Sequence, residues 1–257
     1  MFSLNKKYLL SQVLHKTKGI VVRVTKYGET SLIVLIYTEQ FGIQTYLVQG
    51  VRSSSVKKSS QANYFQPGAI LDLVVYHHEQ RSLQRIKEYK WAHLYESLLF
   101  DVIKNSMLLY IIELISKTIR QPESNSDLFS FLEEGLIWLD KHSIEDSASF
   151  PIYVSIHLCS FLGFQMHTNG NPDHQIFHIS DGKFSEEISV NSTSFEGESV
   201  MLLKELMNVM HPEDLTEIPL SRTNRQEILE MMEAYYKAHI PEFGQMRTLP
   251  ILRQIFN

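Results

Sequence analysis

Three β-strand patterns follow one another closely near the start of the chain, and they constrain its fold more than any other feature. In the strand predicted at 18–26, Ile20, Val22 and Val24 point to one face, and Val21, Arg23 and Thr25 point to the other, which is the period-2 pattern of a strand. Most of 30–38 is a continuous apolar and β-branched run, short enough to be a strand buried on both faces. A tight turn that ends in Gly42 precedes a third strand at 43–50. These residues therefore predict a curled β-meander.

Two further strands are predicted after a loop that runs to about Asn63. A Gln-Pro-Gly turn at 66–68 precedes the fourth strand, at 69–76. The fifth strand, at 83–90, has a weaker pattern and carries three cations. Five short strands in about seventy residues predict a small barrel and not a layered α/β sheet.

The loop between the third and fourth strands is basic and rich in serine. It contains Arg52, Lys57 and Lys58 among five serines, with almost nothing to bury. Cations on such a loop can follow the phosphates of a nucleic acid. The alternative interpretation is that these charges only make the loop soluble.

After the fifth strand, the spacing of apolar residues becomes helical. The first predicted helix starts at about Glu96 and ends before Pro122, and Asn125 offers an N-cap for the second helix. A third helix is predicted to begin at Pro151, a favourable residue in a first helical turn, and to end at Gly163. Two more helices are predicted further on, at 197–210 and 222–240.

The predicted fold class is α+β, with a five-stranded barrel in 1–90 followed by an all-α helical domain in 91–257. Residues 164–196 are rich in Asn, His, Asp, Ser and Gly, so they are predicted to be an irregular insertion. The residues from 241 onward form a tail for which no separate element is predicted.

Charge is distributed unevenly between the two predicted domains. Residues 1–90 contain 13 Lys and Arg against 5 Asp and Glu, a formal net charge of +8, whereas residues 91–257 contain 11 against 24, a net charge of −13. Opposite signs favour two domains, of which the first faces a polyanion. The alternative is that the charges of small domains differ by chance.

The chain has the composition of a soluble cytoplasmic protein. Its single cysteine, Cys159, excludes an intramolecular disulfide and fits a reducing compartment. The first ten residues contain no apolar segment long enough for a signal sequence. The most apolar segment, near 98–119, is interrupted by Asp101, Lys104 and Glu113, so no membrane partner is expected.

No motif of a known catalytic or nucleotide-binding site occurs in the sequence. The P-loop, dinucleotide-binding, zinc-protease and serine-hydrolase patterns are all absent. The cluster His77-His78-Glu79 is favoured as a solvated turn, because adjacent residues on a strand point to opposite faces. We therefore expect a protein that is not an enzyme and that needs no cofactor.

A series of short motifs along most of the chain occurs in an order and at spacings that match one known family. They are Lys18–Val21, Tyr27–Glu29, Thr38, Gly42, Gly50–Arg52, Gln66–Gly68, Glu113-Leu114, Leu128-Phe129, Leu229–His239 and Leu249–Leu252. On these residues, the chain resembles the RecO family of bacterial recombination mediators. The resemblance implies an N-terminal oligonucleotide-binding (OB) barrel and a C-terminal helical domain. It also implies single-stranded DNA binding, strand annealing and loading of the recombinase onto DNA coated by single-strand-binding protein, usually with the partner RecR.

One feature of many relatives is missing. They carry four cysteines that bind zinc in the region matching 164–184, where this chain has none. Zinc needs about four nitrogen or sulfur ligands in a closed tetrahedral site. Nearby candidates do not form a tight pair, so we expect no metal site; they are His157, Cys159, His167, His174 and His178.

The expected DNA-binding residues are cations of the first domain and one aromatic residue. Cations follow the phosphates, whereas aromatic rings stack on bases. For Tyr46, stacking on DNA and packing in the barrel are equally good interpretations; Tyr27 is a further candidate platform, and Phe41 is expected to pack. The expected set is Lys18, Arg23, Lys26, Tyr46, Arg52, Lys57 and Lys58.

The resemblance also implies that the helical domain binds the acidic C-terminal tail of single-strand-binding protein. Arg120 and Arg225 are candidates to bind the tail's carboxylates, and the alternative is that they pair with neighbouring glutamates. A different class of function remains open: a protein adaptor whose helical domain binds partners and whose barrel is mainly structural. A steep loss of DNA affinity with salt separates the two functions.

Overall fold

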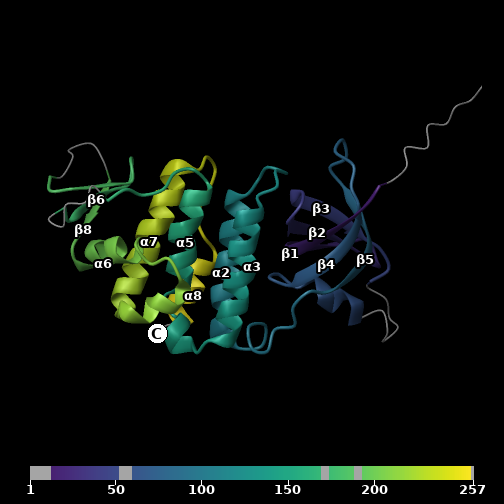
Figure 1. Ribbon diagram of the computed structural model, residues 1–257, viewed down its shortest axis with the longest axis horizontal. Helices are drawn as coiled ribbons and strands as arrows, with labels where there is room; N and C mark the ends of the chain where they lie inside the picture. Colours follow the sequence, from purple (N-terminus) through teal and green to yellow (C-terminus); the bar gives the residue numbers. More distant parts are fainter. Residues whose placement is uncertain (1–12, 52–59, 169–173, 188–192, 256–257) are drawn as a thin grey trace, which may run out of the picture. The chain divides into compact units, whose positions relative to one another are not determined.

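The computed structural model describes residues 13–51, 60–168, 174–187 and 193–255 (Figure 1). The chain divides into two compact units. The barrel unit comprises 1–92 and 122–124, and the helical unit comprises 93–121 and 125–257.

The barrel unit is a closed five-stranded barrel with the strand order β1-β2-β3-β5-β4 (Figure 1). All neighbouring strands are antiparallel except β3 and β5, which are parallel and pair over a short stretch. This arrangement confirms the expected OB-fold barrel. The strands are β1 (Leu14–Tyr27), β2 (Ser31–Thr38), β3 (Gly42–Val48), β4 (Ile70–Tyr76) and β5 (Gln84–Trp91).

Strand β1 closes the barrel because it pairs with β4 along its first half and with β2 along its second half. Gly19 lies where the two pairings overlap, and a Cβ atom there would be 2.5 Å from Ile36 Cγ2 and 3.0 Å from Leu73 Cδ1. A bulge between Val21 and Arg23 then interrupts the register. Bulges bend a strand and increase its twist, which lets one strand serve both neighbours.

The barrel core is built from the inward residues of all five strands and from the 3₁₀ helix η1 (Ser60–Phe65). Phe65 is 2% exposed and packs edge-to-face on Tyr89, with 4.8 Å between ring centroids. Tyr64 stacks on Trp91 at 5.1 Å. These aromatic contacts anchor η1 against β5 after the basic loop.

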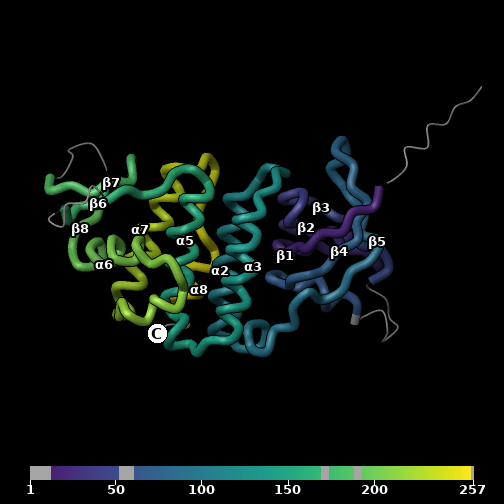
Figure 2. The backbone as a smooth tube through the Cα atoms, viewed as in Figure 1, coloured from purple at the N-terminus to yellow at the C-terminus, as the bar shows by residue number. Residues whose placement is uncertain are grey.

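The helical unit contains seven α-helices among its described residues, and α5 packs against both α2 and α7 (Figure 2). In the part of the chain that is described, no helix is long and apolar enough to cross a membrane. The helices are α2 (Val102–Thr118), α3 (Ser126–Lys141), α4 (Ile144–Ser147), α5 (Phe150–Phe161), α6 (Glu198–Leu206), α7 (Arg222–His239) and α8 (Thr248–Ile255), with a 3₁₀ helix η2 (Pro212–Glu217).

The helix starts follow from capping side chains. The Asp101 carboxylate accepts the backbone N–H groups of Ile103 and Lys104, both at 2.9 Å, so α2 begins at Val102 and not near Glu96. Asn125 caps α3 as the sequence predicts, since its Oδ1 accepts Leu128 N–H at 2.9 Å.

Two regions contain more structure than the sequence predicts. The insertion near 164–196 is not simply irregular, because β6 (Ile176–His178), β7 (Lys183–Ser185) and β8 (Ser194–Glu196) form a sheet in the order β7-β6-β8. Three-residue strands are too short to show a clear alternation. The tail contains α8, whose start is held by the Glu113 carboxylate, which accepts Thr248 N–H at 2.8 Å.

Candidate nucleic-acid interface

The outer surface of β1, β2 and β3 is apolar in its middle and carries an arginine on each side. Arg23 pairs with Leu35 across β1 and β2, and Leu35 alternates with the buried residues of β2, so both side chains point outward. One row further, Ile33 pairs with Leu47, and Leu47 pairs with Arg85. Both arginines are exposed, and the three aliphatic side chains are half-buried. We call this the arginine face.

The β1–β2 hairpin extends this surface. Tyr27 lies four residues after Arg23 and two after Thr25, so the three side chains point to the same side of β1. Tyr27 is 54% exposed, which leaves much of its ring accessible. Lys26 is also exposed, but it pairs with the buried Leu32 and points to the opposite side of β1 from Tyr27. The accessible aromatic ring therefore lies on the side of Arg23, and Lys26 does not.

The β4–β5 hairpin forms a hollow of about 450 Å³ next to the arginine face. Gln84 fixes its shape: its Nε2 donates to the carbonyl oxygens of His78 at 2.8 Å and of Arg81 at 2.7 Å, and its Oε1 accepts His78 N–H at 3.0 Å. Two exposed cations, Arg81 and Arg85, and one exposed carboxylate, Glu79, line this hollow, and Leu83 is 41% exposed. The hairpin thus presents cations on a fixed backbone.

Arg81 and Arg85 are missing from the set that the sequence predicts. Arg85 is one of the three cations of the predicted fifth strand, but the direction of its side chain depends on a register shift between Val74 and Val75. A pattern of alternation cannot locate such a shift. Only the pairing of Leu47 with Arg85 places this cation on the arginine face.

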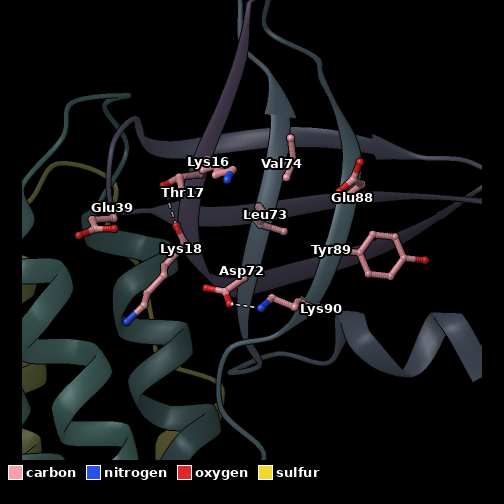
Figure 3. Close-up of a pocket in the computed structure, with 10 residues that line it drawn as sticks. All are labelled: Lys16, Thr17, Lys18, Glu39, Asp72, Leu73, Val74, Glu88, Tyr89 and Lys90. Atoms are coloured by element: carbon pink, nitrogen blue, oxygen red, sulfur yellow. Dashed lines mark hydrogen bonds and ion pairs between the residues drawn. The ribbon is translucent and has the colours of Figure 1, made fainter.

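Lys18 lies on a different side of the barrel from Arg23 and Lys26. It pairs with Asp72, which pairs with Lys90, so the three side chains form one row across β1, β4 and β5 (Figure 3). Lys90 Nζ lies 3.3 Å from Asp72 Oδ2.

A hollow of about 550 Å³ surrounds this row. Three cations and three carboxylates line it, so its charge is balanced; they are Lys16, Lys18, Lys90, Glu39, Asp72 and Glu88. A surface whose positive and negative charges balance attracts a polyanion less strongly than the arginine face does.

The structure corrects the expected role of Tyr46 in DNA binding. Its ring is 0% exposed and packs in the barrel core beside Val34, so it cannot stack on a base in this structure. Burial raises the pKa of its hydroxyl. Phe41 is packed, as the sequence favours: its ring stacks on His77 with 3.9 Å between centroids.

Arg52, Lys57 and Lys58 lie outside the described residues. In the helical unit, Arg120 Nη2 donates to the Glu242 carbonyl at 3.1 Å, and its Nη1 lies 3.6 Å from the Glu242 carboxylate. Arg225 Nη1 donates to the Leu220 carbonyl at 2.7 Å.

The two arginines do not share one pocket. Arg225 is in the first turn of α7, whereas Arg120 contacts Glu242, beyond the other end of that helix. At 1.5 Å per residue, the two ends of this 18-residue helix are about 25 Å apart. A single bound carboxylate cannot contact both.

Three of the five residues considered for zinc have side-chain hydrogen bonds to other groups. Cys159 is buried, and its thiol donates to the Ser155 carbonyl at 3.2 Å. His157 Nε2 donates to the Val209 carbonyl at 2.8 Å, and His178 Nε2 is 2.7 Å from Ser185 Oγ. Within the described ranges, no group of three or more His, Cys, Asp or Glu is arranged to hold a metal ion.

A closed OB barrel joined to a helical unit defines a two-unit OB-fold protein, and comparison with known proteins identifies the family. Residues 12–95 match the family model described as "Recombination protein O N terminal", and residues 99–247 match "Recombination protein O C terminal". The chain therefore belongs to the RecO family of DNA repair proteins, as its sequence motifs indicate.

Individual relatives cover nearly the whole chain. The chain is 35% identical over 243 residues to the DNA repair protein RecO of Flavobacterium psychrophilum, covering 94% of this chain and 99% of the relative. It is 35% identical over 240 residues to the protein of the same name from Christiangramia forsetii, covering 93% and 98%. The RecO of Bacteroides fragilis is 30% identical over 246 residues, covering 95% and 100%.

Proposed function

We propose that this protein is a recombination mediator that binds single-stranded DNA through the arginine face and the adjoining β4–β5 hollow. In this role it promotes annealing of complementary strands and helps to load the recombinase onto DNA coated by single-strand-binding protein. It acts by binding and not by catalysis. RecR and the tail of single-strand-binding protein are its proposed protein partners, as the family implies.

The observation that carries the proposal is the position of Arg23 and Arg85 on either side of an aliphatic strip in an OB barrel. Phosphates are attracted to the two guanidinium groups, and the half-buried Ile33, Leu35 and Leu47 offer an apolar surface between them. In single-stranded DNA the apolar faces of the bases are accessible to such a surface, whereas in a duplex these faces are covered by the neighbouring stacked bases.

Tyr27 supplies the aromatic ring that the buried Tyr46 cannot supply. It is accessible at the hairpin and lies on the same side of β1 as Arg23. Stacking of a base on an aromatic ring is worth about 1–3 kcal/mol by alanine substitution and tolerates any base. The proposed surface therefore binds without strong sequence preference, as a mediator requires.

Fluorescence anisotropy with labelled oligo-dT at several salt concentrations tests the proposal. The double variant R23A/R85A is expected to bind more weakly and to have a shallower salt dependence, by about 0.7 in slope for each phosphate that the variant no longer neutralises. The matched control is K16A/K90A, which removes two charges from the balanced hollow on the other side. Equal affinities and slopes in R23A/R85A and the wild type would exclude the arginine face.

The adaptor function is the second candidate, because the helical unit is large and has its own core. It predicts weak DNA binding with little salt dependence in the full-length protein. Calorimetry with the tail peptide of single-strand-binding protein, and with the same peptide lacking its terminal phenylalanine, measures the partner binding that both candidates share. An annealing assay with complementary oligonucleotides then separates them, since only a mediator accelerates annealing.

A further inference from the structure

One stripe of α3 forms a wall of a groove in the helical unit. The stripe contains Asp127, Phe131, Glu134 and Trp138, spaced as i, i+4, i+7 and i+11, so they lie along one face of the helix. The groove has a volume of about 480 Å³. At 1.5 Å per residue, the stripe is about 16 Å long, which suits a few residues of a peptide.

Two hydrogen bonds fix the opposite wall of the groove, the segment 209–213. Tyr153, on α5, donates its hydroxyl to the Met210 carbonyl at 2.9 Å. His157, one turn further along α5, bonds the Val209 carbonyl at 2.8 Å. The groove is therefore preformed, since both hydrogen bonds connect the segment 209–213 to the same buried helix, α5.

The groove has an aromatic floor and an apolar lip. Trp138 and Tyr153 are 7% and 5% exposed, and Phe131 packs on Tyr153 with 5.8 Å between ring centroids. Phe131 is half-exposed, and Met210 is 68% exposed at the lip. Aromatic faces attract cations, and an apolar lip can contact the aliphatic stem of a lysine or arginine.

The charged side chains that line the groove are acidic, and Ser130 and His211 are further polar residues of the lining. Asp127, Glu134 and Glu213 are exposed, and within the described residues their carboxylates have no ion pair and accept no hydrogen bond. The lining residues include no lysine or arginine. Burial and the nearby Glu213 and Asp214 raise the pKa of Tyr153 to about 12, which agrees with a negative potential at the floor.

Trp138 provides a separate indication of a ligand. Its indole Nε1–H is enclosed and meets no acceptor within the described part of the chain. A buried donor without a partner is costly, and native structures contain few of them. Trp138 lines the groove, and the backbone carbonyl groups of a bound peptide are acceptors of the kind that its indole lacks. Because the Nε1 atom is enclosed, such a contact requires the floor of the groove to open slightly.

We propose that this groove binds a short peptide segment of a protein partner that carries lysine or arginine. The carboxylates attract the cationic groups, and the aromatic floor and Met210 hold the aliphatic stems. A nucleic acid is repelled by the same carboxylates. The inference goes beyond the proposed function, because the tail of single-strand-binding protein is acidic and needs a site of the opposite sign.

Binding of a fluorescein-labelled peptide of alternating lysine and leucine to the full-length protein tests the inference. The same peptide with glutamate in place of lysine is the ligand control. Glu134→Lys is expected to weaken binding of the lysine peptide by about five- to tenfold. Glu205→Lys, the same change at an exposed residue of α6, is expected to weaken it by less than about twofold.

A second variant protects the test against misfolding of Glu134→Lys. Met210→Ser changes only an exposed side chain at the lip, and it is expected to weaken binding of the lysine peptide about threefold because serine offers the lysine stem little apolar surface. Circular dichroism checks that each variant is folded. Equal weakening by Glu134→Lys and Glu205→Lys, or no binding below about 1 mM peptide, overturns the inference.

Discussion

The Oδ1 atom of Asp140 accepts the backbone N–H of Ser97 at 2.8 Å, although 43 positions of the chain separate the two residues. The same carboxylate accepts Glu96 N–H at 2.9 Å and Leu98 N–H at 2.8 Å. Lys104 Nζ donates to the Asp140 carbonyl at 2.8 Å. The turn before α2 is thereby held against the last residues of α3.

We predict that D140N destabilises the protein by about 3 kcal/mol. The Asp140 side chain is 1% exposed, and an asparagine leaves an NH₂ group facing a backbone N–H, so at least one buried donor loses a charged acceptor. Urea denaturation measures the change, with E205Q, at an exposed residue of α6, as a control expected within about 0.5 kcal/mol of the wild type. A small effect of D140N would mean that water replaces the carboxylate.

The pH dependence of D140N follows from the same contacts. Burial alone would raise the pKa of Asp140, but the hydrogen bonds from Glu96, Ser97 and Leu98 outweigh it and lower the pKa below 3.8. A carboxyl group whose pKa is lower in the folded protein than in the unfolded chain stabilises the fold at pH values above the unfolded pKa of 3.8. This stability is lost as the pH falls from there through the folded pKa. D140N is therefore expected to lose less stability than the wild type on acidification below about pH 4.

His157 gives a second prediction, at higher pH. Its burial lowers its pKa from 6.5. Below pH 6.5 the unfolded chain takes up a proton that the folded protein resists, so folding loses stability as the pH falls from there towards the folded pKa. H157Q keeps a donor for the Val209 carbonyl but cannot titrate. Melting temperatures at pH 7.5 and pH 5.5 are expected to differ less in H157Q than in the wild type.

The sequence predicts the barrel well because its strands alternate clearly, but it cannot show how the barrel closes. Lys18 and Arg23 are close in sequence and were expected in one DNA-binding set. In the structure, Lys18 lies on the part of β1 that pairs with β4, whereas Arg23 lies on the part that pairs with β2. The change of partner occurs near Gly19. Pairing of this kind is a long-range property that local periodicity does not contain.

Aromatic residues illustrate the same limit in the candidate site. The face of β3 that carries Tyr46 could not be fixed from its sequence, and the structure places this ring in the core. Tyr27, at the end of β1, is accessible only because the strand continues past the bulge into the hairpin. The short strands β6 to β8 and the eight-residue helix α8 were missed because each is too short for a periodic signal.

Gly19 gives a third prediction, which tests the closure of the barrel. A Cβ atom at this position would be 2.5 Å from the Ile36 side chain, closer than packed atoms come. We expect G19A to destabilise the protein by about 1–3 kcal/mol through overpacking. T25A, at an exposed position of the same strand, is the control and is expected to change stability little. If G19A is as stable as the wild type, the strands shift without cost.

A fourth prediction concerns metal content. We expect the purified protein to hold no stoichiometric zinc, because the cysteine tetrad of many relatives is absent and Cys159 is buried with its thiol bonded to Ser155. Burial also raises the pKa of the Cys159 thiol to about 12, which disfavours the thiolate that binds zinc. Elemental analysis after dialysis measures this. About one zinc per chain would contradict the prediction and make the histidines of 157–178 the ligand candidates.

The last prediction concerns the basic loop and its relation to the arginine face. Arg52, Lys57 and Lys58 follow β3 in the sequence, and Arg23 lies two strands away on the arginine face. If both groups contact one DNA strand, R52A/K57A/K58A is expected to lower the salt slope of DNA binding by about 2. The combined variant, which also carries R23A and R85A, is expected to have a still lower slope.

Stability separates a binding effect from a folding effect in this test. The loop contains almost no apolar residue to bury, so the triple variant is expected to melt at the wild-type temperature. An unchanged salt slope in the triple variant would remove the loop from the DNA site and leave the arginine face and the adjoining β4–β5 hollow as the interface. A combined variant no weaker than R23A/R85A alone would lead to the same conclusion, because independent phosphate contacts add.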